Sequence, residues 1–427
     1  MDTRYINRRH IVVEISGNVV YDADRGKTGG NVVTAQTPTH HVLLLYRELI
    51  PSLVLCGHVQ MKELHRQGCI EYRICTEKKI GDTDFNWAEI VLLGRPDNWL
   101  EYKLVKRFHE AGKLLIYILD DDLLHIADGL GCTLHYRAKE TRKYLKQILT
   151  YSDAILSPSP RLLAQYADEG QCQLLTEEPA IRIVDFVPHD PLMPVKIGFS
   201  GSLDRIGDVE VMLREVLVRV KNKYGKRVLI EFFGVNPSFA KQIDAYSIPY
   251  CETYEKYLAC LEQRNWDIGL APMPDTPFHS CKHYIKLIEY SSVGIASVLS
   301  DVEPYTRVKT TFDRARFCAN TTDEWFAAIC ELLDDRTALE AARLESNQVV
   351  RQKMNLTKVS DALWEQIKRI IPPGELLSSG KHHLGWLRIC YFPKRVQALF
   401  STYGWKTPCT VFWKVVQKIN KMMQKRD

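Results

Sequence analysis

The stretch 88-AEIVLLGRPDNWLEYKLVKRFHEAGKLLIYILDDD-122 decides the fold class. Residues 88–94 form an apolar run that predicts a buried strand, and residues 114–119 form a second one. Between them, residues 98–111 carry apolar side chains at helical spacing and end at Gly112. Two fully apolar strands joined through a helix are typical of a parallel sheet that helices cover on both faces. We therefore predict an α/β protein.

The same alternation continues on both sides of this stretch. Residues 31–36, followed by residues 40–50, are expected to open the same domain, and residues 153–159 predict a later strand. The helix that follows has Ser159 as its N-cap, Pro160 at its first position and Gly170 beyond its end. A hairpin is expected ahead of this sheet, at residues 10–22. Residues 1–190 are thus predicted to form one Rossmann-like domain.

A second alternating block follows a proline-rich segment that ends near residue 194. Strands are predicted near 195–202, 227–235, 266–273 and 295–301, with helices between and after them. Residues 195–372 should therefore form a second Rossmann-like domain. In open parallel sheets, ligands bind outside the carboxyl ends of the strands. Two such sheets in tandem predict a ligand site in a cleft between two domains.

Composition and segment analysis narrow the class of protein. A chain of 427 residues with 45% apolar and 26% charged residues fits about two soluble domains. We find neither a signal peptide nor a run of 18 apolar residues, so secretion and membrane spanning are not expected. The twelve cysteines contain no CxxC pair, which favours reduced thiols in the cytoplasm.

The basic charge is concentrated at the C-terminal end. Residues 379–426 contain ten Lys and Arg and no acid, although the net charge of the whole chain is only +5. Within residues 376–427 an apolar helical face lies opposite a row of lysines, which predicts a basic amphipathic extension on an anionic membrane surface. Docking of its apolar face on the body of the protein is the alternative. No base-reading motif accompanies the charge, so nucleic acid is not expected as a partner.

The stretch 282-KHYIKLIEYSSVG-294 suggests chemistry. On a helix, Lys282, Lys286 and Glu289 would share one face. The amino end of a helix that follows a strand's carboxyl end attracts a diphosphate, and the two lysines would add charge. Glu289 would then accept hydrogen bonds from neutral hydroxyls, such as those of a ribose. An exposed Lys/Glu surface face is the alternative.

A second candidate lies after the first strand of the second block, in 198-GFSGSLDRIGDVE-210. Gly201 would let the backbone approach a ligand at the turn that it forms with Ser202. Arg205 would reach a phosphate oxygen opposite Lys282. A solvated loop cation is the other interpretation of Arg205.

Residues 195–370 resemble the nucleotide-binding half of GT-B glycosyltransferases, in the large retaining family that includes many bacterial polysaccharide and lipopolysaccharide enzymes. The resemblance rests on IGFSGS, on DIGLAPMPDTPF and above all on KLIEYSSVGIASVLSDV. It implies that Glu289 is the second glutamate of the E-x7-E motif of that family and binds the donor ribose. The first glutamate of the motif is replaced here by Cys281, and Asp275 or His279 would have to take over its role.

The run Asp120–Asp122 allows two interpretations. In a GT-A enzyme such a cluster holds Mn²⁺ or Mg²⁺ through hard oxygen ligands. Residues 88–126 also resemble a subgroup of the GT-B transferases with a double aspartate, and a GT-B enzyme needs no metal for its diphosphate. In that interpretation Asp121 and Asp122 are the catalytic candidates, and they face the acceptor or the transferred sugar. His125 or His135 would relay a proton.

The expected activity is transfer of a hexose from a UDP- or GDP-linked donor to a glycan or lipid-linked acceptor at the inner membrane face. The resemblance implies retention of configuration, without a metal or other cofactor. Two alternatives remain: a catalytically inactive GT-B scaffold, which the loss of the first glutamate would allow, and a metal-dependent GT-A-like enzyme that uses Asp120–Asp122.

Overall fold

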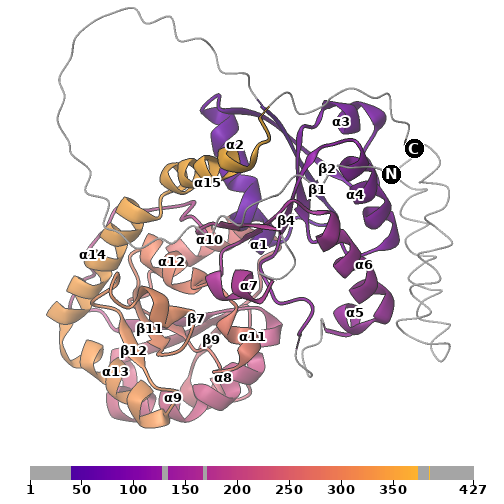
Figure 1. Cartoon of the computed structure of the whole chain (residues 1–427). Coiled ribbons are helices and arrows are strands. Elements are labelled where there is room, and N and C mark those ends of the chain that lie inside the picture. The colour runs from indigo at the N-terminus through magenta and orange to yellow at the C-terminus, as the bar shows by residue number, and fades with distance from the viewer. Residues whose placement is uncertain (1–39, 127–132, 167–170, 374–383, 385–427) are drawn as a thin grey trace, which may run out of the picture.

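The computed structural model describes residues 40–126, 133–166, 171–373 and 384. They form two lobes, each built around a six-stranded, entirely parallel sheet (Figure 1). The strand order is β2-β1-β3-β4-β5-β6 in the first sheet and β12-β11-β10-β7-β8-β9 in the second. The prediction of two Rossmann-like domains is confirmed. The hairpin expected at 10–22 and the helical extension expected at 376–427, apart from Leu384, lie outside the described residues.

The first described strand lies within residues 40–50, which were expected to open the first lobe. Alternate residues of its strands face two apolar cores, so that Leu115 and Tyr117 pack under α4 and α6 while Leu114 and Ile116 pack under α2. Its strands are β1 (His40–Tyr46), β2 (Ile70–Thr76), β3 (Ile90–Gly94), β4 (Leu114–Ile118), β5 (Ala154–Ser157) and β6 (Cys172–Leu175).

Two helices of the first lobe begin at side-chain caps, and Ser159 is the one that the sequence predicted. Asn98 accepts hydrogen bonds from the backbone N–H groups of Leu100 and Glu101 at 2.9 and 3.2 Å, and Ser159 accepts one from Leu162 at 3.3 Å. Gly170 lies outside the described residues. The helices are α1 (Pro51–Leu53), a π-helical turn (Val54–His58), α2 (Val59–Arg66), α3 (Asp82–Trp87), α4 (Trp99–Glu110), α5 (Thr133–Arg137), α6 (Lys139–Tyr151) and α7 (Pro160–Gln165).

The second lobe repeats the pattern. One helix was expected over residues 207–225, between the first two strands of this lobe, but the structure has two helices there, separated at the fully buried Leu213. Helix α14 was not predicted. The strands are β7 (Val195–Ser200), β8 (Val228–Phe233), β9 (Tyr246–Ile248), β10 (Ile268–Ala271), β11 (Ala296–Ser300) and β12 (Arg316–Cys318). The helices are α8 (Ile206–Met212), α9 (Arg214–Tyr224), α10 (Tyr254–Arg264), α11 (Pro277–Ser280), α12 (Ile285–Ser292), α13 (Thr322–Asp334), α14 (Arg336–Lys353) and α15 (Leu356–Ile370), with short 3₁₀ turns at 203–205, 225–227, 240–243 and 305–308.

Helix α15 crosses back to the first lobe and lies beside α2 (Figure 1). Its apolar side chains Leu363, Trp364 and Ile367 join the core that also covers β1, β3 and β4. The side chain of Gln366 pairs with the backbone N–H and C=O of Leu175 at 3.1 and 2.7 Å. One face of the first sheet is therefore covered in part by α15, although this helix follows the second sheet in the sequence.

Helix α12 is fixed against the second sheet through a glycine in β10. A Cβ atom at Gly269 would lie 2.4 Å from the ring of Tyr290, so only glycine leaves room for that ring. The Tyr290 hydroxyl accepts a hydrogen bond from the backbone N–H of Ser200 at 3.1 Å and lies 3.2 Å from the carbonyl of Leu270. This contact places α12 over the carboxyl ends of β7 and β10.

Candidate functional site

The three aspartates after β4 have three different sets of partners. Arg95 makes two hydrogen bonds to the carboxylate of Asp120 and one, at 3.1 Å, to Asp121. Asp122 turns the other way and accepts a hydrogen bond from the hydroxyl of Tyr166 at 3.2 Å, with His125 at 3.0 Å. Among the described residues, no group of three or more His, Cys, Asp or Glu side chains is arranged to hold a metal ion.

Arg95 was not found by sequence reasoning. It follows the apolar strand β3 directly and adopts φ = 53°, a left-handed conformation that is uncommon for residues other than glycine. Burial would lower the pKa of its guanidinium, but Asp120 and Asp121 raise that pKa well above its ordinary value. Unusual backbone conformations of this kind cluster at functional sites. The only signal in the sequence was a charged residue between a buried strand and Pro96.

Asp121 joins the two lobes. Its Oδ1 atom lies 2.7 Å from the ammonium of Lys282, and the two side chains are 25% and 27% exposed. Burial pushes the pKa of Asp121 upward, but Lys282 and Arg95 together hold it below its ordinary value. A second contact runs beside it, because the Cys281 thiol lies 3.1 Å from the side-chain oxygen of Gln165. The position of the missing motif glutamate is thus a buried contact with the first lobe.

Lys282 lies before α12, which corrects the prediction of a helix over 282–294. Helix α11 ends at Ser280, and α12 begins only at Ile285, after Tyr284 as its N-cap. Lys282 therefore does not share a helical face with Lys286 and Glu289. The segment between the two helices is held in place by His283. This side chain is buried and lies 3.0 Å from Glu178 and 3.1 Å from Glu177.

The predicted pair Lys286 and Glu289 does share a face of α12. Lys286 donates to Glu289 Oε2 at 2.7 Å. The same carboxylate accepts hydrogen bonds from the hydroxyls of Tyr254 and Tyr257, at 2.9 and 2.8 Å, and Glu289 is buried. Both carboxylate oxygens therefore already have protein partners. The tyrosines come from α10, and no periodicity around residue 289 could have revealed them.

Arg205 lies near Lys282 at the carboxyl end of the second sheet. It donates to the carbonyl of Pro272 at 2.6 Å and lies 3.2 Å from Asp208. Burial, Arg205 and Lys282 together lower the pKa of His279 to about 4. His279 is therefore neutral at physiological pH, and the charge of this corner comes from the arginine and the lysine.

Gly201 and Ser202 form the turn between β7 and Arg205. The Gly201 N–H donates to the carbonyl of Phe233 at 3.0 Å, and the Gly201 carbonyl faces Gly234, where a Cβ atom would lie only 2.2 Å away. The Ser202 carbonyl accepts a hydrogen bond from the Arg205 N–H at 2.9 Å, and the residue is exposed. Asp275 is also exposed. The turn places Arg205 beside β10.

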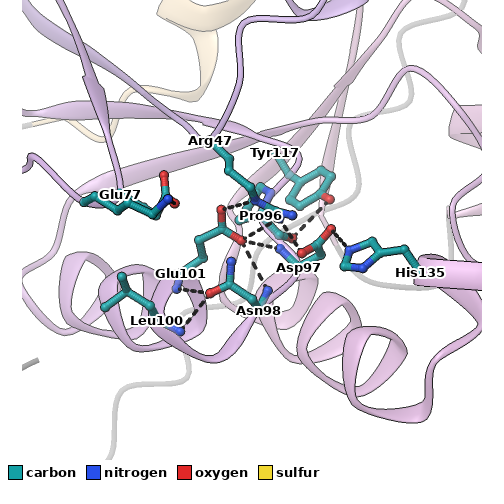
Figure 2. Close-up of polar contacts among 10 residues, drawn as sticks. Arg47, Glu77, Pro96, Asp97, Asn98, Leu100, Glu101, Tyr117 and His135 are labelled. Carbon is teal, nitrogen blue, oxygen red and sulfur yellow. Dashed lines mark hydrogen bonds and ion pairs between the residues drawn. The ribbon is translucent and has the colours of Figure 1, made fainter. Parts of the chain in front are cut away.

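A second polar cluster lies at the carboxyl ends of β1 and β3, and the sequence did not indicate it (Figure 2). Arg47 donates to Asp97 and, at 3.1 Å, to Glu101. The backbone N–H of Asp97 also donates to Glu101 at 2.7 Å, and His135 lies 2.8 Å from Asp97. Burial raises the pKa of Glu101 to about 7 in spite of Arg47. Figure 2 shows Glu77 beside this cluster, not joined to it by any hydrogen bond.

No protein-family model and no curated protein matches this sequence. Solved structures do match in fold. Sucrose-phosphate synthase from Thermosynechococcus elongatus has a TM-score of 0.56 at 10% identity, over 78% of this chain and 99% of that one. HepE from Anabaena, in complex with UDP and glucose, has a TM-score of 0.52 at 10% identity, over 78% and 100%. A protein proposed to be a UDP-N-acetylglucosamine 2-epimerase from Listeria monocytogenes has 0.50 at 10%, over 80% and 99%.

The chain therefore has the GT-B fold, as the resemblance implied. The GT-A architecture that was the alternative for Asp120–Asp122 is wrong, because its single nucleotide-binding sheet cannot accommodate the second lobe. Among the described helices, none is both long enough and apolar enough to cross a bilayer.

Proposed function

We propose that this protein is a glycosyltransferase that transfers a hexose from a UDP- or GDP-linked donor. The observation that carries the proposal is the convergence of Arg205 and Lys282 at the carboxyl end of the second sheet, directly opposite Asp121 of the first lobe. Two cations at this edge suit a diphosphate, and a carboxylate opposite them suits the hydroxyls of a sugar. The matching folds include a structure described as a complex with UDP and glucose, which supports this class of ligand.

In this proposal Arg205 and Lys282 bind the diphosphate, with the turn at Gly201 and Ser202 beside it. Glu289 is buried, with Lys286 on the same helical face, and one lone pair of Glu289 Oε1 is left for a ribose hydroxyl beyond its bond from Tyr254. Asp121 and Asp122 contact the transferred sugar or the acceptor.

We propose a metal-independent reaction, because the two cations offset the diphosphate charge and the three aspartates are engaged separately. We also propose retention of the anomeric configuration, which the resemblance to the retaining family implies, with the leaving diphosphate as the base for the acceptor hydroxyl. The acceptor is proposed to be a glycan or a lipid-linked glycan. The basic segment 379–426 would hold the protein on the anionic inner face of a membrane.

A catalytically inactive nucleotide-binding scaffold is the second candidate. The hydrogen bonds that already occupy both oxygens of Glu289, and Cys281 in place of the first motif glutamate, favour it.

The test has two stages. Thermal unfolding is first followed with UDP, GDP, CMP or ADP, since a ligand that binds only the folded state raises its melting temperature. Transfer and hydrolysis are then assayed with hexoses linked to the stabilising nucleotide, with and without EDTA, and the product anomer is assigned by NMR. Stabilisation without turnover would favour the scaffold, inhibition by EDTA would contradict the metal-free reaction, and no stabilisation by any nucleotide would contradict both candidates. Sedimentation with anionic vesicles, compared with the chain truncated after residue 378, tests the membrane contact.

A further inference from the structure

The ion pair between Asp121 and Lys282 lies where the proposed donor would bind. Lys282 Nζ is 2.7 Å from Asp121 Oδ1, and each side chain is about a quarter exposed. A carboxylate oxygen at this distance makes the same charge-assisted hydrogen bond that a phosphate oxygen would make. In the donor-free protein, Asp121 therefore accepts the hydrogen bond from Lys282 that a phosphate of the donor would otherwise accept.

Arg95 fixes Asp121 in this place. Its guanidinium makes two hydrogen bonds to Asp120 and reaches Asp121 Oδ2 at 3.1 Å, so each oxygen of Asp121 has its own cation. The side chain of Arg95 is 16% exposed, and its left-handed backbone directs it toward these aspartates. A residue held in such a conformation needs surrounding structure to maintain it, and here Asp120 supplies that structure.

The local charge count gives the consequence of donor binding. Arg95 and Lys282 balance Asp120 and Asp121, so the four side chains are neutral together. A diphosphate adds negative charge beside Lys282, which attracts its ammonium away from Asp121. Because Arg95 remains bound to Asp121 Oδ2, the oxygen that Lys282 leaves stays in place and becomes free to accept a hydrogen bond.

We propose that Arg95 is a positioning residue that holds Asp121 on Lys282 in the place of a donor phosphate oxygen. Donor binding moves Lys282 to the diphosphate and frees Asp121 Oδ1 for a hydroxyl of the transferred sugar. This inference rests on the proposed function and assigns Asp121 two successive partners. No bond is made or broken in the exchange, and no proton moves.

The test is the affinity of Asp121→Asn for two probes, UDP and UDP-glucose, or their GDP counterparts if GDP stabilises the wild type. Loss of the competing carboxylate should tighten nucleoside diphosphate binding about fivefold, the size that a partly exposed ion pair supports. The nucleotide sugar should gain less, because its sugar loses a contact, and turnover should fall. Asp185→Asn, which removes an exposed aspartate that pairs with Arg351 of α14 at 3.1 Å, is the matched control and should change nothing.

Arg95→Lys separates positioning from a purely structural role. It should leave Asp121 loosely held, so that kcat falls while KM for the donor stays constant or decreases. Weaker or unchanged UDP binding by Asp121→Asn, or a rise in KM with constant kcat in Arg95→Lys, would overturn the inference while leaving the proposed function intact. Failure of the wild type to bind any nucleoside diphosphate would overturn both.

Discussion

The two strand edges that meet between the lobes use their charges differently. In the first lobe, Arg47 is paired with Asp97 and Glu101, and the two acids are almost completely buried. In the second lobe, Arg205 donates to a backbone carbonyl and lies 3.2 Å from Asp208, and Lys282 takes its partner from the opposite lobe. One edge is complete within its own lobe, whereas the cations of the other have partners that a ligand could replace.

This difference between the partners of the two sets of cations indicates at which edge a ligand should bind. Breaking a buried pair leaves an uncompensated charge and is costly, so such a cluster acts as a scaffold. Exchanging a carbonyl or the Asp121 carboxylate, which is a quarter exposed, for a phosphate costs much less, because the cation remains paired throughout. We therefore assign ligand chemistry to the second edge and its positioning to the first.

The variant Lys282→Ala, for which we expect the largest effect, tests whether the second edge binds the ligand. If Lys282 stabilises charge on the leaving diphosphate, kcat/KM for transfer should fall about 10²- to 10³-fold, as when one preorganised donor is removed from an active site. Steady-state assays with the nucleotide sugar measure this. Lys223→Ala, at an exposed lysine 3.2 Å from Asp334 in the same lobe, is the control and should retain activity. Equal activity of the two variants would refute the assignment.

Arg47→Ala tests the scaffold. Removing the guanidinium leaves Asp97 and Glu101 buried without their main counter-ion, and we expect a loss of about 3 kcal/mol in the free energy of unfolding. Urea denaturation followed by circular dichroism provides the measurement. A loss below about 0.5 kcal/mol, the usual range for a surface substitution, would mean that the two edges do not differ in this way.

Glu289→Gln examines the predicted ribose-binding residue, which is buried like the scaffold carboxylates. Because an amide keeps the shape but weakens the bonds to Tyr254, Tyr257 and Lys286, stability should fall by about 1–2 kcal/mol. If a ribose also binds here, KM for the donor should rise about tenfold. Tyr254→Phe is the matched variant, since it removes one of the same bonds and leaves the carboxylate. A rise in KM of the same size in both variants would assign Glu289 a structural role alone.

The smallest expected effect is the pH dependence contributed by Glu101. Its pKa is about 7 in the folded protein and 4.5 ordinarily, so the folded state binds more protons between these values. Its stabilising contribution is complete below pH 4.5 and declines as the pH rises to about 7. Asp97, whose pKa is lowered, titrates below pH 3.8, outside this window. Urea denaturation across pH 4.5–7 should show a flatter profile for Glu101→Gln than for the wild type, and parallel profiles would count against the pKa.

Sequence reasoning found the parts of the fold that depend on neighbouring residues. The apolar runs that became β3 and β4 and the cap of α7 at Ser159 are local patterns, and the structure confirms them. The start of α12 was wrong, because the buried position of His283 between Glu177 and Glu178 holds the preceding segment out of a helix. Helix propensity depends on neighbouring residues and therefore cannot predict a contact between residues so far apart in the sequence.

The residues of the candidate site also fall into those that the sequence indicated and those that it did not. Lys282, Arg205 and Asp121 could be selected because each follows a predicted strand in a parallel sheet, where carboxyl ends gather ligands. The partners of Glu289 could not, since Tyr254 and Tyr257 reach it from α10, and the role of Arg95 became evident only from its contacts with Asp120 and Asp121.

By itself, the sequence determined two tandem parallel sheets and the edge of each where polar residues collect, because periodicity and strand order are properties of consecutive residues. Only the tertiary structure decided that Asp121 lies on Lys282 and that α15 covers the first sheet. Those contacts join residues more than 150 positions apart, and their free energy depends on burial and distance, which no local pattern records.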